Sequence, residues 1–219
     1  FDGVLVDSYQ AHLRSWNDAL RPRGLAMSRD DFSATFGRTS REIIEQLFPG
    51  RIDKNQHAAL DAEKEAAYRR GLAERFPAMD GAPELLAALA AAGFRLAIGS
   101  SGPPENVQVV LENLPGADAI AAAVDGRQVT RGKPHPEVFL RAAEKLAVPP
   151  ARCACIEDAP AGIRAARAAG MAAVGLTGTA DRKTLEQAGA HLVVDSLREL
   201  SPEALATLLD EAARAPIDD

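Results

Sequence analysis

Apolar residues recur along the chain in two different patterns, and the change between them comes near residue 80. From Tyr9 to Phe76 the apolar positions lie three and four residues apart, which is typical of amphipathic helices. This block has no convincing strand pattern, so we expect a small helical bundle. The spacing predicts four helices, over Tyr9–Leu20, Arg29–Thr35, Arg41–Leu47 and Asn55–Leu72.

A short apolar run, Val4–Asp7, precedes the helical block, and we interpret it as the end of a strand. The side chain of Asp7 or Ser8 is then placed to cap the first helix, because its oxygen can accept a hydrogen bond from a free backbone N–H. The helical block therefore follows a strand.

From Asp80 onward, helical patterns alternate with short apolar runs that are typical of buried strands. This alternation predicts an α/β fold, a Rossmann-like parallel sheet with helices on both faces, in which ligands bind at the carboxyl ends of the strands. Strands are expected at Phe94–Ile98, Ala119–Val124, Cys153–Ile156 and Ala172–Leu176, followed by a closing strand. Helices are expected at Glu84–Ala92, Glu105–Leu111, Pro136–Leu146 and Ala161–Ala169, followed by a last helix through Ala213.

Composition restricts the partners of the protein. The chain has 25 Lys and Arg against 31 Asp and Glu, a net charge of −6, and no basic run, so we expect no nucleic-acid partner. Its longest apolar stretch, Leu85–Gly93, is too short to span a bilayer, and no membrane partner is expected. Two cysteines cannot support a disulfide framework. We expect a cytoplasmic protein that is a monomer or a small homo-oligomer.

Polar side chains follow the opening fragment of the chain and three of the predicted strands. Hydroxyl and ammonium groups suit the oxygens of a phosphoryl group, and carboxylates suit the Mg²⁺ that neutralises its charge. Each residue alone has an ordinary explanation as a turn, a helix cap or a solvated charge. Their coincidence at successive strand ends predicts a site for a phosphate group and Mg²⁺ instead. The residues are Asp2 and Gly3, Ser100 and Ser101, Lys133, and Glu157 and Asp158.

Four runs of the sequence resemble, in order and spacing, the four motifs of haloacid dehalogenase superfamily phosphatases. They are Phe1–Ser8, Ile98–Gly102, Gly132–Pro136 and Ile156–Ile163. The helical block resembles the cap of the β-phosphoglucomutase-like branch of that superfamily. The resemblance implies a discontinuous α/β core, residues 1–8 and 77–219, with residues 9–76 inserted as a helical cap domain.

The first family motif resembles Asp-x-Asp-Gly, and Asp2 and Gly3 match its second Asp and its Gly. By this resemblance the first Asp, the nucleophile, is expected immediately before Phe1, on a central strand. A sheet without that strand would leave the neighbouring strands unpaired and an apolar face uncovered. We therefore expect the protein to continue upstream of Phe1.

The resemblance also implies the chemical roles. The nucleophile would form an aspartyl-phosphate, while Asp2 acts as general acid and then general base. By the same resemblance, Mg²⁺ would be bound by the backbone carbonyl of Asp2, by Asp158 and by the missing nucleophilic Asp, with Glu157 either a direct ligand or one shell further out. The residues implied for catalysis and for holding the phosphoryl group are Gly3, Ser100, Ser101 and Lys133, the last of which balances the carboxylates.

Within the helical block, His12, Trp16 and Lys64 match positions that face the active site in the β-phosphoglucomutase-like branch. Without the resemblance, Trp16 is expected in the core, His12 at a packed interface and Lys64 in solvent. Arg38 lies in a run, residues 37–41, that resembles the cap loop over the substrate. Arg38 or Arg41 could contact a second anionic group there, or equally form surface ion pairs with nearby glutamates.

Three functions are compatible with these residues. The first is Mg²⁺-dependent hydrolysis of a small phosphorylated metabolite, a sugar phosphate or a phosphoglycolate-like acid. The second is a β-phosphoglucomutase-type sugar phosphomutase, which the donor-poor run Gly102–Pro104 disfavours, as does Ser40 where that enzyme carries an Arg. Arg41 keeps this alternative open if the alignment shifts by one residue. The third is a non-catalytic binding homologue, if the residue before Phe1 is not Asp.

Overall fold

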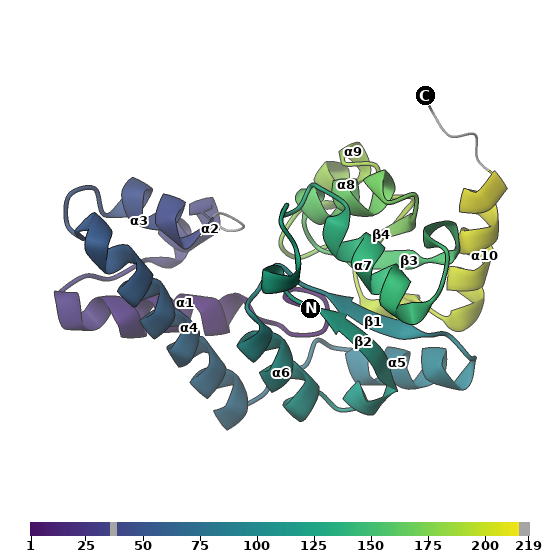
Figure 1. Cartoon of the computed structure of the whole chain (residues 1–219), viewed down its shortest axis with the longest axis horizontal. Helices are drawn as coiled ribbons and strands as arrows, with labels where there is room; N and C mark the ends of the chain where they lie inside the picture. Colours follow the sequence, from purple (N-terminus) through teal and green to yellow (C-terminus); the bar gives the residue numbers. More distant parts are fainter. Residues whose placement is uncertain (36–38, 215–219) are drawn as a thin grey trace. The chain divides into compact units, whose positions relative to one another are not determined.

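The computed structural model describes residues 1–35 and 39–214, and the chain divides into two compact units (Figure 1). Unit 1 consists of Phe1–Val6 and Ala78–Asp219, and unit 2 consists of Asp7–Pro77. The residues described contain no helix that is long and apolar enough to cross a membrane.

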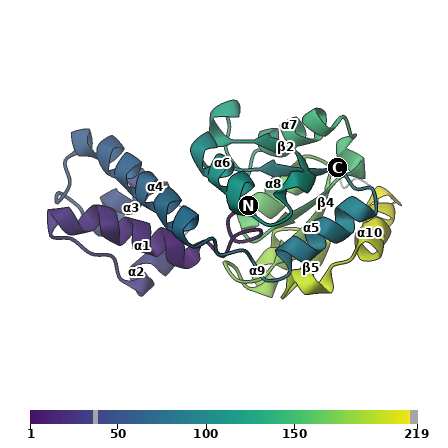
Figure 2. The ribbon, with the colours of Figure 1, turned by 90° about the horizontal axis from the view of Figure 1, so that it is seen from below.

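Unit 2 is built from helices. They are α1 (Tyr9–Leu20), α2 (Arg29–Thr35), α3 (Ser40–Leu47) and α4 (His57–Glu74), with 3₁₀ turns at Arg21–Arg23 and Lys54–Gln56. Helices α1 and α4 pack side by side (Figures 1 and 2). Thr39 and Glu42 form a reciprocal capping box that starts α3. The predicted cap of α1 is wrong, because Ser8 occupies the cap position but makes no side-chain capping bond.

Unit 1 holds five parallel strands. They are β1 (Leu96–Gly99), β2 (Ile120–Val124), β3 (Ala154–Glu157), β4 (Ala172–Leu176) and β5 (Leu192–Val194). The helices of this unit are α5 (Ala82–Ala91), α6 (Pro104–Asn113), α7 (Glu137–Leu146), α8 (Pro160–Ala168), α9 (Arg182–Gln187) and α10 (Pro202–Arg214). The predicted α/β class with parallel strands is confirmed. Only α9 was not predicted, because its six residues bury a single side chain, Leu185, and leave no apolar period to detect.

Apolar side chains cover both faces of the strands. Strand β4 is buried along its whole length, and its side chains alternate between two core clusters. Ala173 packs in the cluster that includes Ile163 of α8 and Leu185 of α9. Val174 packs on the opposite face, in the cluster that contains residues of α5 and α10. This layering leaves the strand ends as the accessible edge of the unit.

The strands form two sheets, whereas their alternation with helices predicts one. One sheet has the order β1-β2 and the other has the order β3-β4-β5. Within residues 1–35 and 39–214, the edges of β1 and β3 have no second ladder partner. A cavity of about 790 Å³ runs along both strands and is lined by apolar side chains that include Leu89 and Phe139. The cavity therefore lies between the two sheets, along the edges of β1 and β3.

The opening residues form a turn, so their interpretation as the end of a strand is wrong. The carbonyl oxygen of Phe1 accepts hydrogen bonds from three backbone amides, those of Val4, Leu5 and Val6, at 3.2, 2.8 and 3.1 Å. Val6 makes only isolated bridges, to Asp2 and to Ala78. Gly3 allows the turn because its φ of +68° lies in the left-handed region that favours glycine.

Candidate active site

The four motif segments meet in unit 1 through contacts between residues far apart in the sequence. A Cβ atom added to Gly3 would lie 1.8 Å from Oδ2 of Asp158, so the backbone of Gly3 packs directly against that carboxylate. At Gly102, an added Cβ would lie 3.9 Å from the Phe1 ring. Nζ of Lys133 donates a hydrogen bond to Oε1 of Glu157. These contacts bring the first, second, third and fourth motif segments together.

Glu157 and Asp158, which we call the acidic pair, lie where β3 ends. Glu157 is the last residue of the strand, and both side chains are buried. A Cβ added to Gly162 would lie 2.1 Å from Cδ of Glu157, so only glycine at this position in α8 leaves room for the carboxylate. The acidic pair is therefore enclosed by backbone on the α8 side.

Lys133 neutralises one member of the acidic pair. Besides its hydrogen bond to Glu157, its Nζ lies 4.8 Å from the centroid of the Phe139 ring, a cation–π distance. Burial alone would lower the pKa of Lys133, but the charge and hydrogen bond of Glu157 outweigh it and raise the pKa. The lysine therefore stays charged at neutral pH.

Asp158 carries the less well compensated charge. Burial and the neighbouring Glu157 raise the pKa of Asp158 to about 6, although a hydrogen bond that the Thr179 hydroxyl donates to Oδ2 opposes the shift. Burial makes the ionised form of a carboxylate unfavourable. A cation bound beside the carboxylate would offset that cost. Both the Thr179 bond and the close approach of Gly3 involve the same oxygen, Oδ2.

The loop after β1 carries the predicted phosphate donors. Ser100 is buried, its amide donates to the carbonyl of Val124 at 2.9 Å, and its hydroxyl accepts from the amide of Gly102 at 2.9 Å. Ser101 is exposed, and its carbonyl oxygen would lie 2.3 Å from a Cβ added to Gly126. The loop is thus held between β2 and the residues that follow it.

Asp2 lies beside Gly3 and so beside the acidic pair, but its carboxylate does not complete a metal cluster. Among the residues that the structure describes, no group of three or more His, Cys, Asp and Glu side chains is placed to hold a metal ion. The predicted ligands Asp2, Glu157 and Asp158 therefore do not form such a side-chain cluster. The resemblance assigns the backbone carbonyl of Asp2 to the cation, and that role does not depend on a side-chain cluster.

The candidate residues of unit 2 pack around one aromatic group. The His12 ring stacks on Tyr68 at 4.0 Å between centroids, and Nζ of Lys64 lies 6.0 Å from the Trp16 ring and 5.6 Å from that of Tyr68. Trp16 is a core residue. The expectation that Lys64 is solvated is wrong, since its side chain is buried and pairs with Glu65 at 2.6 Å.

The arginines of the predicted cap loop are described only in part. Arg38 lies outside the described residues. Arg41 forms an exposed ion pair with Glu45, with Nε 3.1 Å from Oε1. This pair corresponds to the surface alternative raised by the sequence for Arg41.

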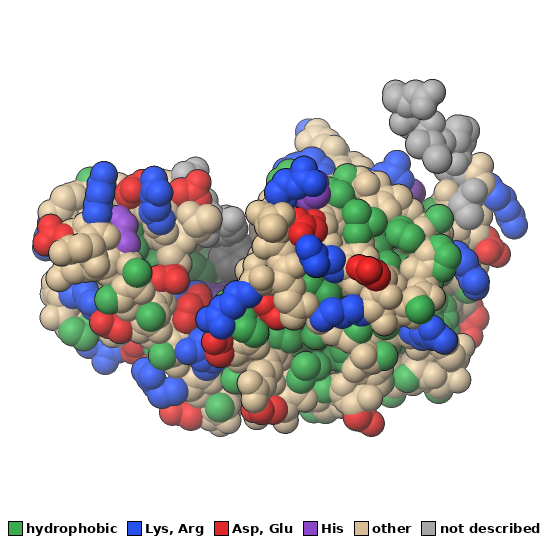
Figure 3. Space-filling model, in the orientation of Figure 1, with side chains coloured by type: hydrophobic (Ala, Val, Ile, Leu, Met, Phe, Trp, Pro, Cys, Tyr) green, Lys and Arg blue, Asp and Glu red, His purple; other side chains and the backbone are tan. Residues whose placement is uncertain are grey.

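Three residues of the site were not singled out in the sequence: Phe139, Gly162 and Thr179. Thr179 could have been found, because it follows β4 and the strand-end criterion applies to that strand as well. Gly162 lies within the fourth motif segment, although no role was assigned to it, and Phe139 carries no such signal because an apolar residue in a helix is ordinary. Figure 3 shows basic and acidic side chains interspersed over the visible face, without a patch of one sign.

Comparison with known proteins gives concordant matches over nearly the whole chain. A family model described as haloacid dehalogenase-like hydrolase matches residues 1–170. β-Phosphoglucomutase from Bacillus subtilis is 32% identical over 211 residues, covering 93% of this chain and 90% of that protein. Hexitol phosphatase A from Escherichia coli is 30% identical over 204 residues, covering 91% and 90%.

Solved structures agree with the sequence matches. A crystal structure of a haloacid dehalogenase hydrolase, family IA, variant 3, from Entamoeba histolytica superposes with a TM-score of 0.83 at 29% identity. The alignment covers 96% of this chain and 96% of that one. Both units are therefore included in the structural similarity.

Proposed function

The chain belongs to the haloacid dehalogenase-like hydrolases, and from that membership we propose that it hydrolyses the phosphate ester of a small metabolite with Mg²⁺, through an aspartyl-phosphate. At the level of enzyme class, the expected phosphatase of the haloacid dehalogenase type is confirmed. The observation that carries the finer proposal is the meeting of Lys133, the acidic pair and Gly3 at the carboxyl ends of the strands.

The residues present fit a magnesium ion. Mg²⁺ is bound by oxygen ligands, usually through one or two carboxylates together with substrate phosphate and water. Asp158 supplies a buried carboxylate with an elevated pKa, and Glu157 is already held by Lys133. We therefore assign Asp158 as the side-chain ligand, the Asp2 carbonyl as a second ligand, and Glu157 to a supporting position behind them. Mg²⁺ bound there would neutralise the charge on the phosphoryl oxygens.

The nucleophilic aspartate is assigned to a strand that would fill the cavity between β1 and β3. Two parallel edges without a second partner and about 790 Å³ of mainly apolar space support this assignment. A strand that ends immediately before Phe1 would place its last side chain next to Gly3 and the loop at Ser100. Attack by this carboxylate on phosphorus would form the aspartyl-phosphate.

The other residues of this chain position the phosphate and move the proton. Asp2 protonates the leaving oxygen of the ester and then removes a proton from the attacking water. The Ser100 hydroxyl and the Ser101 amide donate to the phosphoryl oxygens, and Lys133 supplies positive charge beside them. In unit 2 we assign a substrate contact to His12, which is only partly buried, whereas Trp16 and Lys64 are buried and pack in the same aromatic group.

A feature of the loop after β1 favours hydrolysis over phosphoryl transfer between sugar hydroxyls. A phosphomutase must hold a second phosphate, which requires additional donors. Here Pro103 precedes α6 and Pro104 begins it, and neither residue has a backbone N–H or a polar side chain. The named activities of relatives, a hexitol phosphatase and a fructose-1-phosphate phosphatase, support a sugar or sugar-alcohol phosphate as the substrate class.

The test is phosphate release by the full-length protein from a panel of sugar phosphates, sugar-alcohol phosphates and phosphoglycolate, with Mg²⁺ or with EDTA. Release is expected only with Mg²⁺. Interconversion of glucose 1-phosphate and glucose 6-phosphate is measured in parallel. Mutase turnover faster than phosphate release would overturn the proposal, and absence of both would favour a binding homologue.

The role of Asp2 is tested by Asp2→Asn. Turnover should fall by about 10²- to 10⁴-fold, since the variant cannot transfer the proton. Calorimetric Mg²⁺ binding should be retained, because the backbone carbonyl is unchanged. The matched control is Asp118→Asn, which removes an exposed carboxylate on the 3₁₀ turn at the amino end of β2. Near-normal turnover of Asp2→Asn would contradict the assignment.

A further inference from the structure

The loop after β4 places two threonine hydroxyls on two carboxylates. Oγ1 of Thr177 donates to Oδ1 of Asp195 at 2.9 Å, on the surface. Oγ1 of Thr179 donates to Oδ2 of Asp158, which is buried. The two threonines thus make the same kind of bond from the same loop, but only one of the bonds reaches the acidic pair.

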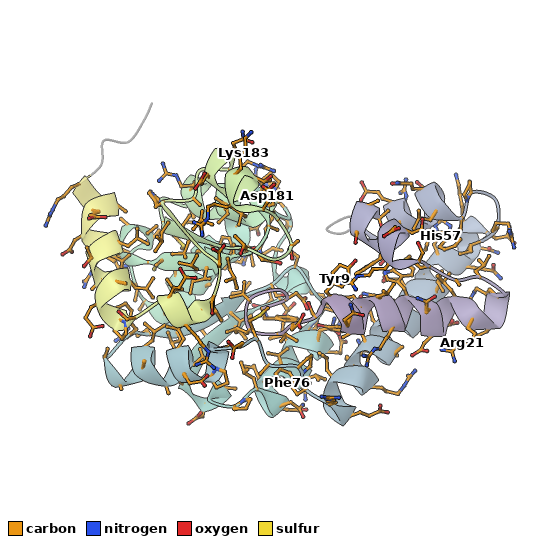
Figure 4. The ribbon with its side chains drawn as sticks, turned by 180° about the vertical axis from the view of Figure 1, so that it is seen from behind. Tyr9, Arg21, His57, Phe76, Asp181 and Lys183 are labelled. Atoms are coloured by element: carbon orange, nitrogen blue, oxygen red, sulfur yellow. The ribbon has the colours of Figure 1, made fainter. Side chains whose placement is uncertain are left out.

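Both ends of this loop are held in place. The amide of Thr177 donates to the carbonyl of Val194, which continues the pairing of β4 with β5. At the other end, the Asp181 side chain accepts from the amide of Thr184 and caps α9, whose first turn is marked in Figure 4 by Asp181 and Lys183. Thr179 lies between two anchored points, so its hydroxyl is presented in a defined position.

Two contacts of the Asp158 side chain involve the same carboxylate oxygen. Oδ2 accepts from Thr179 and also lies against the backbone of Gly3. A donor on one oxygen fixes the rotation of the carboxylate plane, and that rotation determines where the other oxygen points. Without the hydroxyl, Oδ2 would lose the hydrogen bond that the loop after β4 donates to it.

We propose that Thr179 is a positioning residue, which orients the Asp158 carboxylate to bind a divalent cation through the hydroxyl hydrogen bond to Oδ2. The inference rests on the proposed function, since it assumes that Asp158 is a cation ligand. It adds a residue outside the four motif segments, on the loop of a different strand. A side chain that holds a ligand from behind contributes to affinity without touching the ion.

The test compares Thr179→Val with Thr177→Val in the full-length protein. Each variant replaces one hydroxyl by a methyl group at nearly constant volume. Because Thr179 is exposed, its substitution leaves no buried cavity. Mg²⁺ binding is titrated by calorimetry without substrate, and the melting temperature is measured in EDTA. Thr179→Val should raise the Kd for Mg²⁺ by about 10- to 100-fold, and Thr177→Val should leave it unchanged.

Two further variants keep the inference testable if Thr179→Val folds poorly. Thr179→Ser retains the hydroxyl and should bind Mg²⁺ nearly as the wild type does, whereas Thr179→Ala should lose affinity as the valine variant does. Equal Kd values for wild type and Thr179→Val, or equal losses in Thr179→Val and Thr177→Val, would overturn this inference alone. A wild-type protein that binds no Mg²⁺ would overturn the proposed function as well.

Discussion

Replacing Asp158 by Asn should stabilise the metal-free protein at neutral pH while it removes the response to Mg²⁺. Asn has nearly the same shape as Asp and keeps an oxygen that can accept the Thr179 hydrogen bond. What it removes is a buried negative charge beside Glu157. The metal-free site is therefore expected to carry a cost in stability, which the proposed cation would offset.

The magnitude follows from the pKa of Asp158. Its value of about 6 in the folded protein, against an ordinary 3.8, corresponds to about 3 kcal/mol. Because the folded-state pKa is raised, the wild type is more stable when Asp158 is protonated, and that stability is lost as pH rises from about 4 through about 6. Asn does not titrate, so the advantage of Asp158→Asn should be near zero at pH 4 and approach about 3 kcal/mol at pH 7.5.

The free energy of unfolding of both proteins is measured by urea unfolding in EDTA, at pH 4 and at pH 7.5. The difference between the two proteins is then compared at the two pH values, so that titrations common to both proteins cancel. Saturating Mg²⁺ at pH 7.5 should then stabilise only the wild type, because a ligand stabilises the folded state that binds it. A difference in unfolding free energy that does not grow between the two pH values would refute the reasoning. Stabilisation of the variant by Mg²⁺ would refute the assignment of Asp158 as a ligand.

Two substitutions test the packing of the site. Gly3→Ala should destabilise the protein by more than Gly170→Ala, as measured by urea unfolding. Both glycines have a positive φ, +68° and +73°, so the backbone strain is similar. A Cβ at Gly3 would lie 1.8 Å from the Asp158 carboxylate, whereas a Cβ at Gly170 would meet nothing within 4 Å. Equal losses would contradict the close packing against the acidic pair. Lys133→Ala should cost about 3–5 kcal/mol, since it leaves a buried carboxylate unpaired. The control is Arg141→Ala, which breaks an i,i+4 ion pair with Glu137 and should cost under about 1 kcal/mol. A similar loss of stability in both variants would show that the ion pair of Lys133 with Glu157 is screened by solvent.

Local patterns predicted most of the elements and the polar residues that follow the strands, whereas the four motif segments were identified by resemblance to a family. The limits of α1, α2 and β4 agree with the predicted ranges because apolar spacing and strand length are readable from neighbouring residues. The strand-end criterion identified Lys133 and the acidic pair, which the structure joins. It was not applied to β4 and so missed Thr179. Helix α9 was missed because one buried residue in six gives no period.

The errors concern burial and pairing between distant segments. Without the resemblance, Lys64 is expected in solvent because lysine is seldom buried, yet its side chain is buried and its Nζ lies 6.0 Å and 5.6 Å from the ring centroids of Trp16 and Tyr68. Val4–Asp7 resembles a strand in composition but folds back on the carbonyl of Phe1. In both cases a partner that is not visible in the local pattern decides the outcome.

By itself, the sequence determined the order of helices and strands and the chemistry at the strand ends, because both depend on residues that are close along the chain. Only the tertiary structure showed which strand edges pair, β1 with β2 and β3 with β4, because such pairing joins segments that are far apart along the chain. It also decided that Gly3 and Thr179 contact the same oxygen of Asp158. That oxygen lies where segments from three parts of the chain converge, and no spacing rule along one segment can describe such a contact.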